Sequence, residues 1–92
     1  MILVGLEIEW LNCVGASKKQ IVFFDSNDIH EAAVETLKCN WSSGYQSSRV
    51  LRGEFHDTKT EKTWSVDNGG HTKKDYRNET DLSFEKRWRE GR

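Results

Sequence analysis

Apolar and polar side chains alternate along the first part of the chain with the period of two that a half-buried strand requires. Leu6, Ile8 and Trp10 alternate with Glu7 and Glu9, and this pattern predicts a strand over residues 2–14. A polar, glycine-containing connector follows at residues 15–19, and a second apolar run comes after it over residues 20–25. Because the connector is short, we predict that the two strands pair as an antiparallel hairpin.

Residues 28–40 carry the pattern of an amphipathic helix. Ser26, Asn27 and Asp28 precede it, and their side-chain oxygens are good acceptors for the free N–H groups of a first helical turn. Asp28 and Glu31 stand at the spacing of a capping box. The stripe expected to face the sheet repeats every four residues and consists of Ile29, Ala33 and Leu37, with Ala32 beside them.

A second pair of strands is predicted after the helix, over residues 45–56 and 62–67. In the first of these strands Leu51 and Phe55 share the inward face. Unbroken alternation also places Arg49 on that face, nearer the start of the strand, and turns His56 outward.

The last quarter of the chain is predicted to leave the sheet. The glycines at 69 and 70 break the pattern, and residues 71–78 are nearly all polar, which indicates a linker. Capping residues then precede a short helix over residues 82–89, in which Phe84 and Trp88 lie one turn apart on the same side. These two rings are expected to dock the helix on the domain, with a role as exposed anchors for a partner as the alternative.

These elements predict an α+β fold. The sheet is expected to be four-stranded and antiparallel, in the chain order ββαββ, with one helix packed on it and a short C-terminal helix. The chain of 92 residues supports a single small domain. Residues 1–67 would form its hairpin–helix–hairpin core, and residues 68–92 the polar linker and the short helix. A core of this size leaves little room for a deep substrate cleft.

The net charge of −1 conceals a mild asymmetry between the two halves. Residues 1–44 carry three Lys or Arg and six Asp or Glu, whereas residues 45–92 carry eleven and nine. This balance excludes a strongly basic nucleic-acid domain and an overall acidic mimic of DNA. The N-terminus lacks a basic segment, and no apolar run approaches the roughly 18 residues of a membrane span, so we expect a cytoplasmic protein without signal peptide or anchor.

No constellation of side chains predicts catalysis. The three histidines, His30, His56 and His71, are expected at the surface and apart from one another, so they do not surround a water or a metal ion. Cys13 and Cys39 lack the spacing of a zinc site and are expected as free, half-buried thiols, with a disulfide between them left open. The glycines at 69 and 70 do not lead into a helix, so we expect a plain turn there. We therefore predict no enzymatic activity, no metal and no cofactor.

Two sets of charged residues are the candidate contact surfaces. The basic set is interleaved with aromatic rings, as suits phosphates, stacked bases or an acidic protein face, and it consists of Arg49, Arg52, Lys59, Lys62, Lys73, Lys74, Arg77, Arg87, Trp88 and Arg89. The acidic set would meet a basic partner and consists of Asp28, Glu31 and Glu35. A solvated mixed-charge surface and helix capping explain the same residues without a partner, so both interpretations stay open.

The segment from Phe23 to Leu37, in which a strand runs into acidic caps and a Glu-Ala helix, resembles a pattern of small phage-encoded inhibitors. In length and layout the whole chain is similar to the anti-CRISPR proteins of phages, above all to those that inhibit the type I-F surveillance complex, also called the Csy complex. The motif that carries the likeness is Asp28-Ile29-His30-Glu31-Ala32. Several members of this class are strongly acidic and imitate DNA, and this chain departs from them in its many arginines and lysines.

The resemblance implies binding without chemistry. Members of this class dock on the crRNA-loaded complex and prevent its hybridisation to target DNA, or they block nuclease recruitment. The expected function is therefore that of a non-enzymatic phage inhibitor that occupies the groove in which target DNA pairs. The expected partners are Cas7-type backbone subunits, with Cas5 or Cas8 and the crRNA as further contacts, in the cytoplasm of the infected bacterial host. No membrane and no small-molecule substrate are expected.

Two alternative functions stay open from the sequence. The first is a small nucleic-acid-binding module that uses the basic set. The second is an inhibitor of another host protein, such as RNA polymerase.

Overall fold

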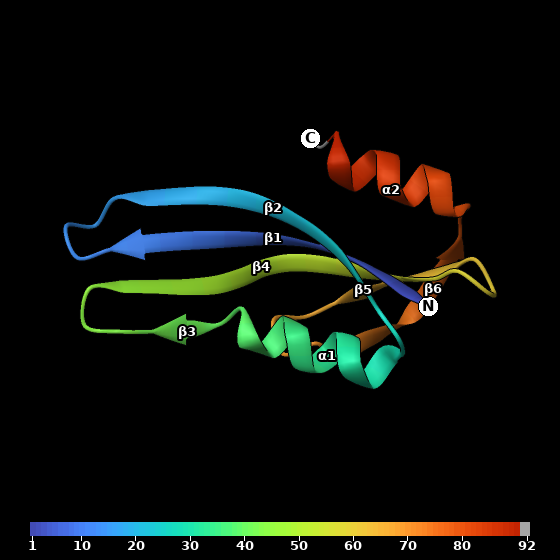
Figure 1. Cartoon of the computed structure of the whole chain (residues 1–92), viewed down its shortest axis with the longest axis horizontal. Helices are drawn as coiled ribbons and strands as arrows, with labels where there is room; N and C mark the ends of the chain where they lie inside the picture. The colour runs from blue at the N-terminus through green and yellow to red at the C-terminus, as the bar shows by residue number, and fades with distance from the viewer. Residues whose placement is uncertain (91–92) are drawn as a thin grey trace.

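The computed structural model of the chain describes residues 1–90 as an α+β fold with one open antiparallel sheet of six strands and two helices. The elements are, in chain order, β1 (Ile2–Asn12), β2 (Ser17–Ser26), α1 (Ile29–Lys38), β3 (Trp41–Ser42), β4 (Gln46–Asp57), β5 (Lys62–Val66), β6 (Thr72–Asn78) and α2 (Asp81–Arg89). The sheet has the order β2-β1-β4-β5-β6, and β3 pairs with β4 away from β5 (Figure 1). The α+β class and the antiparallel first hairpin are thereby confirmed.

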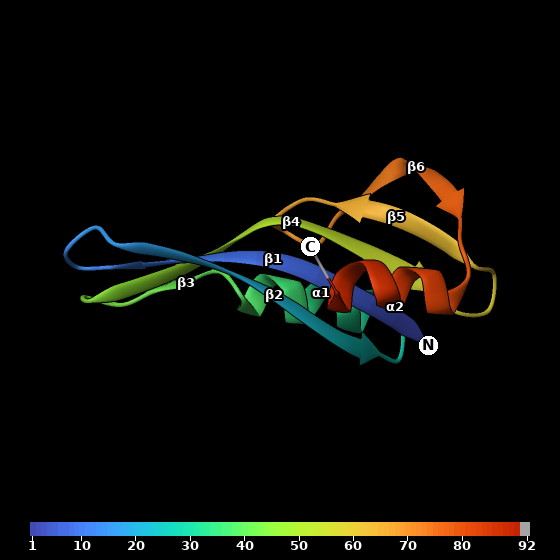
Figure 2. The same ribbon diagram turned by 90° about the horizontal axis from the view of Figure 1, so that it is seen from above.

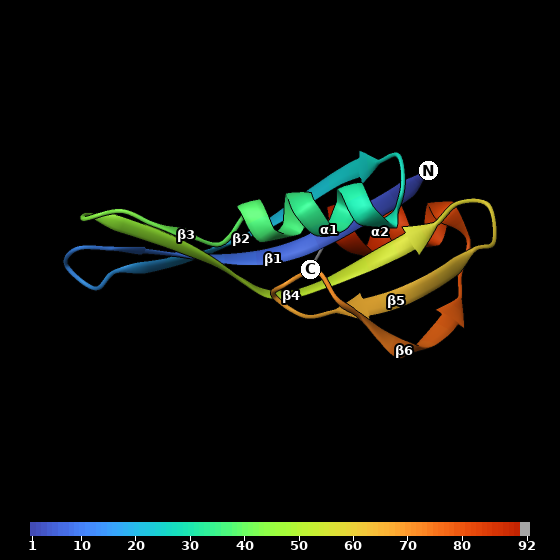
Figure 3. The ribbon, with the colours of Figure 1, turned by 90° about the horizontal axis from the view of Figure 1, so that it is seen from below.

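The two helices cover opposite faces of the sheet. Figure 2 shows α2 in front of the strands, and Figure 3, from the other side, shows α1 in front. The main core lies between α1 and the sheet and consists of Ile2, Val4, Leu6, Ile8, Ala32, Val50, Phe55 and Val66. On the opposite face α2 buries Phe84 and Trp88, so the expected docking of the C-terminal helix is confirmed. Neither helix has the length and apolarity needed to cross a bilayer, as far as residues 1–90 are concerned.

The N-terminus of α1 is capped as the sequence predicts, with one difference. The carboxylate of Asp28 accepts a hydrogen bond of 2.8 Å from the backbone N–H of Glu31. The Glu31 side chain, however, bonds the N–H of Asn27 at 3.0 Å and not that of Asp28. Two orphan donors at the start of the helix are therefore satisfied, as in a capping box that reaches back one residue further.

The apolar stripe predicted on α1 is wrong, because the helix is rotated slightly and turns a neighbouring row of residues towards the sheet. Ala32 and Thr36 are buried against the sheet, whereas Ile29 and Leu37 are 38% and 52% exposed. The polar Thr36 fits this position because its hydroxyl donates a hydrogen bond of 2.9 Å to the carbonyl of Ala32. A pattern based on hydrophobic residues alone does not predict a core threonine whose hydroxyl has a hydrogen-bond partner.

The predicted polar linker is wrong, because residues 72–78 form the edge strand β6. All seven of its residues are exposed, so it shows no apolar alternation, and only its backbone pairing with β5 defines it. The run before it is a hairpin turn, in which the Asp67 carboxylate accepts hydrogen bonds of 2.9 Å and 3.0 Å from the N–H groups of Gly69 and His71. The expected plain turn is therefore confirmed. The other strand that the sequence did not predict is β3, which has only two residues.

A β-bulge at Leu51 changes which side chains of β4 share a face. Glu7 of β1 pairs with Arg52, but the next residue, Ile8, pairs with Val50, so Leu51 is the extra residue. Arg49 consequently lies on the face of Arg52, under the side of the sheet that carries α2. The prediction that Arg49 shares the face of Phe55 is wrong for this reason.

The β1–β2 hairpin and the β3–β4 hairpin extend beyond the ends of both helices (Figure 1, left). We call this extension the wing and define it as residues 10–20 and 41–48, which include the β1–β2 turn and the β3–β4 turn. It contributes to a length of 44 Å in a molecule that measures only 21 Å along its shortest axis. Neither helix covers the wing in Figure 1.

Candidate functional site

Arginines and glutamates form a set of ion pairs across the face of the sheet that carries α2. Arg49 contacts Glu9 at 2.9 Å, and Arg52 contacts Glu7 at 3.1 Å. Each pair joins directly opposite residues of β1 and β4. The guanidinium of Arg52 also lies 4.8 Å from the centre of the Trp88 ring, as in a cation–π contact.

Glu54 is the centre of these contacts. Its carboxylate contacts the guanidinium of Arg77 at 3.1 Å and that of Arg87 at 2.7 Å, and it accepts a hydrogen bond of 3.0 Å from the indole N–H of Trp88. Arg87 in turn contacts Glu79 at 2.7 Å. We call the eight charged residues the ion-pair lattice, which consists of Glu7, Glu9, Arg49, Arg52, Glu54, Arg77, Glu79 and Arg87.

The lattice changes the titration of its innermost members. Burial by itself would raise the pKa of Glu79, but hydrogen bonds from Arg87, Ser83 and Thr63, with the charge of Arg87, lower that pKa to about 2. The hydrogen bond to Glu79 is also the largest cause that raises the pKa of Arg87, ahead of the opposing effect of burial. Four glutamates thus balance four arginines, and this face offers no excess of positive charge for phosphates.

A pH prediction follows for Glu79. Because its pKa is lower in the folded state than the ordinary value of 4.5, its ionised form stabilises the protein above that pH. This stabilisation is expected to be lost as the pH falls from about 4.5 towards 2. Because Arg87 keeps part of its hydration, which weakens the ion pair, we expect the stabilisation to amount to about 2 kcal/mol. Urea unfolding of Glu79→Gln should show this loss in full at pH 7 and only about a quarter of it at pH 2.5, where most of the carboxylate is still ionised in the folded state.

The matched control for that measurement is Glu85→Gln, which removes a more exposed carboxylate paired with Arg89 at 2.9 Å. It should change the stability by only a few tenths of a kcal/mol at either pH. An equal loss for Glu79→Gln at both pH values would contradict the ionic origin of the effect.

The lysines of the predicted basic set do not gather at one place. Lys59 lies in the β4–β5 turn, whereas Lys73 and Lys74 lie on β6 at the sheet edge. Within residues 1–90 none of these three forms an ion pair. Lys62 lies 4.6 Å from the centre of the Tyr76 ring, and Arg89 lies over Phe23 at 4.9 Å. The predicted basic surface is therefore divided into a neutral lattice, an Arg89 that is paired with Glu85, and scattered lysines.

Trp88 is not an exposed anchor. The residue is 3% exposed, and its ring lies over Gly5, where a Cβ atom would be only 2.2 Å from the Trp88 ring atom Cδ2. The residue thus contributes to the attachment of α2, and its predicted place among partner-binding residues is wrong for the folded protein. Phe84 has the same structural role.

The acidic set is engaged within its own helix. Asp28 and Glu31 cap α1, as described above, and Glu35 contacts Lys38 at 3.3 Å. These contacts account for all three carboxylates without a partner. Because the side chains stay accessible, their contact with a basic partner stays a prediction.

His56 is buried, and the prediction of a surface histidine there is wrong. Its ring nitrogens lie 2.7 Å from a carboxylate oxygen of Asp81 and 2.8 Å from the hydroxyl of Thr63, and the ring stacks on Phe84. Strand alternation turns His56 outward, and α2 covers that face only because the chain returns to it some 25 residues later. The histidine links α2 to β4 and is closed to a substrate.

The remaining nucleophiles and ligands do not form a reactive centre. Burial, with a smaller contribution from the Glu35 carboxylate, raises the pKa of the Cys39 thiol, which lowers its reactivity. Cys13 is exposed at the wing turn, contrary to the half-buried site predicted, and both thiols are free. Within residues 1–90 no three His, Cys, Asp or Glu side chains are arranged to hold a metal ion.

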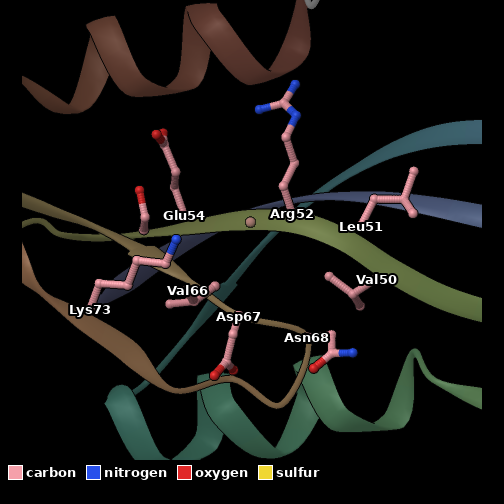
Figure 4. Close-up of a pocket in the computed structure, with 10 residues that line it drawn as sticks. Val50, Leu51, Arg52, Glu54, Val66, Asp67, Asn68 and Lys73 are labelled. Carbon is pink, nitrogen blue, oxygen red and sulfur yellow. The ribbon is translucent and has the colours of Figure 1, made fainter.

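An open hollow of about 390 Å³ lies beside β4, where neither β3 nor β5 pairs with it. Figure 4 shows Arg52 and Glu54 pointing towards α2 on one side, Asp67 and Asn68 on the other, and Lys73 extending from β6. The Asn40 side chain bridges the gap, because it accepts a bond of 2.8 Å from the N–H of Val50 and donates one of 2.6 Å to the carbonyl of Asn68. Arg52, Glu54 and Asp67 already have partners here, and Lys73 is left as a single cation, so the hollow has no convergent set of free polar groups.

The wing differs from the rest of the molecule in its composition. Its 19 residues contain no Asp or Glu, although the chain has 15, and they include two of the four tryptophans. Val14 and Tyr45, at the two turns, are 80% and 77% exposed, and Trp41 is 40% exposed. Trp10 and Trp41 contact each other edge to face, with ring centres 5.5 Å apart. Four of the nine exposed large apolar and aromatic side chains of residues 1–90 therefore lie in the wing.

Sequence reasoning missed the wing because its halves are far apart in the chain. The pairing of β1 with β4 brings residues 10–12 beside residues 46–48, and no local pattern reveals this. A signal was nevertheless present, since two segments without carboxylates are unusual in a chain in which 32% of the residues are charged. Comparison with protein-family models, with curated proteins and with solved structures finds no match for this chain.

Proposed function

We propose that this protein is a non-enzymatic binding protein that engages its partner through the wing. The observation that carries the proposal is the gathering of exposed rings and uncharged polar groups on a projecting part of the sheet that contains no carboxylate. Aromatic side chains bury a large area with little loss of conformational freedom, and serines and amides supply adaptable hydrogen bonds around them. The sheet beneath is continuous with the core, so the surface is presented in a fixed geometry.

We propose further that the partner is the type I-F crRNA-guided complex and that the protein blocks its pairing with target DNA by occupying the groove, in the cytoplasm of the infected host. The resemblance of the chain to phage anti-CRISPR proteins supports this choice of target. The narrow, elongated shape is consistent with insertion of the wing into a groove. The ion-pair lattice argues against a mechanism in which the arginines simply cover phosphates, because each arginine already contacts a glutamate.

Binding of labelled target DNA to purified Csy complex tests the proposal. The wild-type protein is expected to abolish this binding at a near-stoichiometric ratio. Tyr45→Ala should weaken the inhibition by at least about tenfold, as truncation of an interface hot spot does. The matched control is Tyr76→Ala, since Tyr76 is also an exposed tyrosine, at 51%, but lies on β6 away from the wing.

Three results would contradict parts of this proposal. Unchanged DNA binding in the presence of excess protein would exclude the Csy complex as the target. Equal losses for Tyr45→Ala and Tyr76→Ala would exclude the wing as the contact surface. Inhibition that requires catalytic turnover, with far less protein than complex, would exclude a stoichiometric binding protein.

A further inference from the structure

We infer that the face of the wing on the side of α1 is a stacking platform for single-stranded nucleic acid. This inference rests on the proposed function in taking the wing as the contact surface, and it names the chemistry of what that surface binds. It concerns a different face from the ion-pair lattice, which lies on the side of α2.

Strand register places four side chains in one row across this face. Trp10 of β1 pairs with Lys18 of β2 on one side and with Ser48 of β4 on the other, and Ser48 pairs in turn with Trp41 of β3. Directly paired residues of antiparallel strands point to the same face. The row therefore crosses all four strands of the wing, a width of roughly 14 Å from the usual strand spacing.

The two tryptophans in the row are held in place before any ligand binds. The indole N–H of Trp10 donates a hydrogen bond of 2.9 Å to the side-chain oxygen of Gln20. The Trp41 ring meets that of Trp10 at an angle of 73°, and it is the more exposed member of the pair. Ser48, between them in the row, donates its hydroxyl to the carbonyl of Cys39 at 2.8 Å and fixes β4 to the end of α1. A base that stacks here would find rings whose orientation needs little further ordering.

The charge of this face suits a polyanion. Lys18 lies in the row itself, and no Asp or Glu occurs anywhere in residues 10–20 or 41–48. Glu35 of α1 is the last carboxylate before residues 41–48, and Lys38 neutralises it at 3.3 Å. Glu7 and Glu9 project from the opposite face, where Arg52 and Arg49 neutralise them. Phosphates would therefore meet a lysine and no repelling group.

These features together favour a single strand over a duplex or an acidic protein. Accessible aromatic rings next to a cation are what single-strand platforms use, because every unpaired base offers a π-face for stacking while the phosphates meet the cation. In a duplex the faces of the bases are already stacked on their neighbours. An acidic peptide would satisfy Lys18 but would leave the paired tryptophans without their best ligand.

Fluorescence anisotropy with a labelled 12-nucleotide single-stranded RNA of mixed sequence tests the inference on the full chain at low salt. We expect saturable binding that a duplex of the same sequence and poly-L-glutamate compete for only weakly. Trp41→Ala should weaken binding by roughly 5- to 100-fold, and Trp41→Phe, which keeps a ring, by much less. Lys18→Gln should weaken binding and reduce the slope of log K against log salt by roughly 0.7.

Matched controls lie elsewhere on the sheet. Tyr76→Ala removes an exposed ring and Lys73→Gln an exposed lysine, both on β6, and neither should change the affinity. The inference is overturned if no anisotropy change occurs, if poly-L-glutamate competes as well as the RNA, or if the β6 variants weaken binding as much as the wing variants. Circular dichroism of each variant shows whether a loss of binding reflects unfolding.

The outcome separates this inference from the proposed function. Inhibition of the Csy complex through Tyr45 without RNA binding at Trp41 would overturn the inference and leave the proposed function standing. RNA binding at the wing with no effect on the Csy complex would support the inference and exclude the Csy complex as the target.

Discussion

Replacing Gly5 with alanine is expected to lower the free energy of unfolding by about 3 kcal/mol and to loosen α2 from the sheet. A Cβ atom on Gly5 would lie 2.2 Å, 2.4 Å and 2.6 Å from three atoms of the Trp88 ring, far inside van der Waals contact. The strand cannot retreat, because β1 is paired on both sides, with β2 and with β4. The ring must therefore move, and the hydrogen bond from its N–H to Glu54 is lost with it.

Urea unfolding followed by tryptophan fluorescence measures this effect. The matched control is Gly44→Ala, since a Cβ atom on Gly44 would have nothing within 4 Å and the methyl group should be tolerated. A double-mutant cycle makes the test specific: in a Trp88→Ala background, the additional loss from Gly5→Ala should nearly vanish. An equal loss in both backgrounds would mean that the clash with Trp88 is not the cause.

Local patterns in the sequence predicted the parts of the fold that depend on local physics. The alternation of Leu6, Ile8 and Trp10 identified β1, and the cap at Asp28 identified the start of α1. The pair Phe84 and Trp88 identified the buried side of α2. In each case the signal and the structure lie within one strand or within one or two helical turns.

The features that escaped prediction depend on contacts between distant segments. β6 has no apolar residue pattern, because both its faces meet solvent and only β5 specifies it. His56 is buried because Asp81, far along the chain, closes over it. The bulge at Leu51 reverses the faces of β4 beyond it, which a strict period of two does not anticipate.

Contacts between distant segments also explain why the candidate site in the structure differs from the one that the sequence predicts. Arginines and glutamates that look like two separate charged sets in the sequence are directly opposite each other in the sheet, as Arg52 and Glu7 are. Because of this pairing, the arginines are no longer free ligands for phosphate. The wing replaces them as the candidate, because the register of β1, β4 and β3 gathers Trp10 and Trp41 from segments about 30 residues apart.

Replacing Glu54 with alanine is expected to have two effects at once. It should lower the free energy of unfolding by about 2–3 kcal/mol, because the N–H of the buried Trp88 loses its acceptor and two guanidinium groups lose a charged partner. It should also create a polyanion-binding surface on the α2 side of the sheet, where the wild-type protein has none. Arg77 depends on Glu54 for its closest contact, at 3.1 Å, while Glu79 lies 3.7 Å away, so Arg77 is the cation most fully released.

Unfolding in urea and the salt concentration needed for elution from heparin measure the two effects. Glu54→Gln, which keeps an acceptor for Trp88 but not the charge, should lose less stability and yet elute later than wild type. Glu85→Ala, which removes a more exposed glutamate on α2, should change the stability little. Because Arg77 and Trp41 lie on different surfaces, adding Trp41→Ala should leave the gained heparin binding intact. A Glu54→Ala protein that elutes like wild type would mean that the lattice does not restrain the arginines, and the basic set would again be a candidate contact surface.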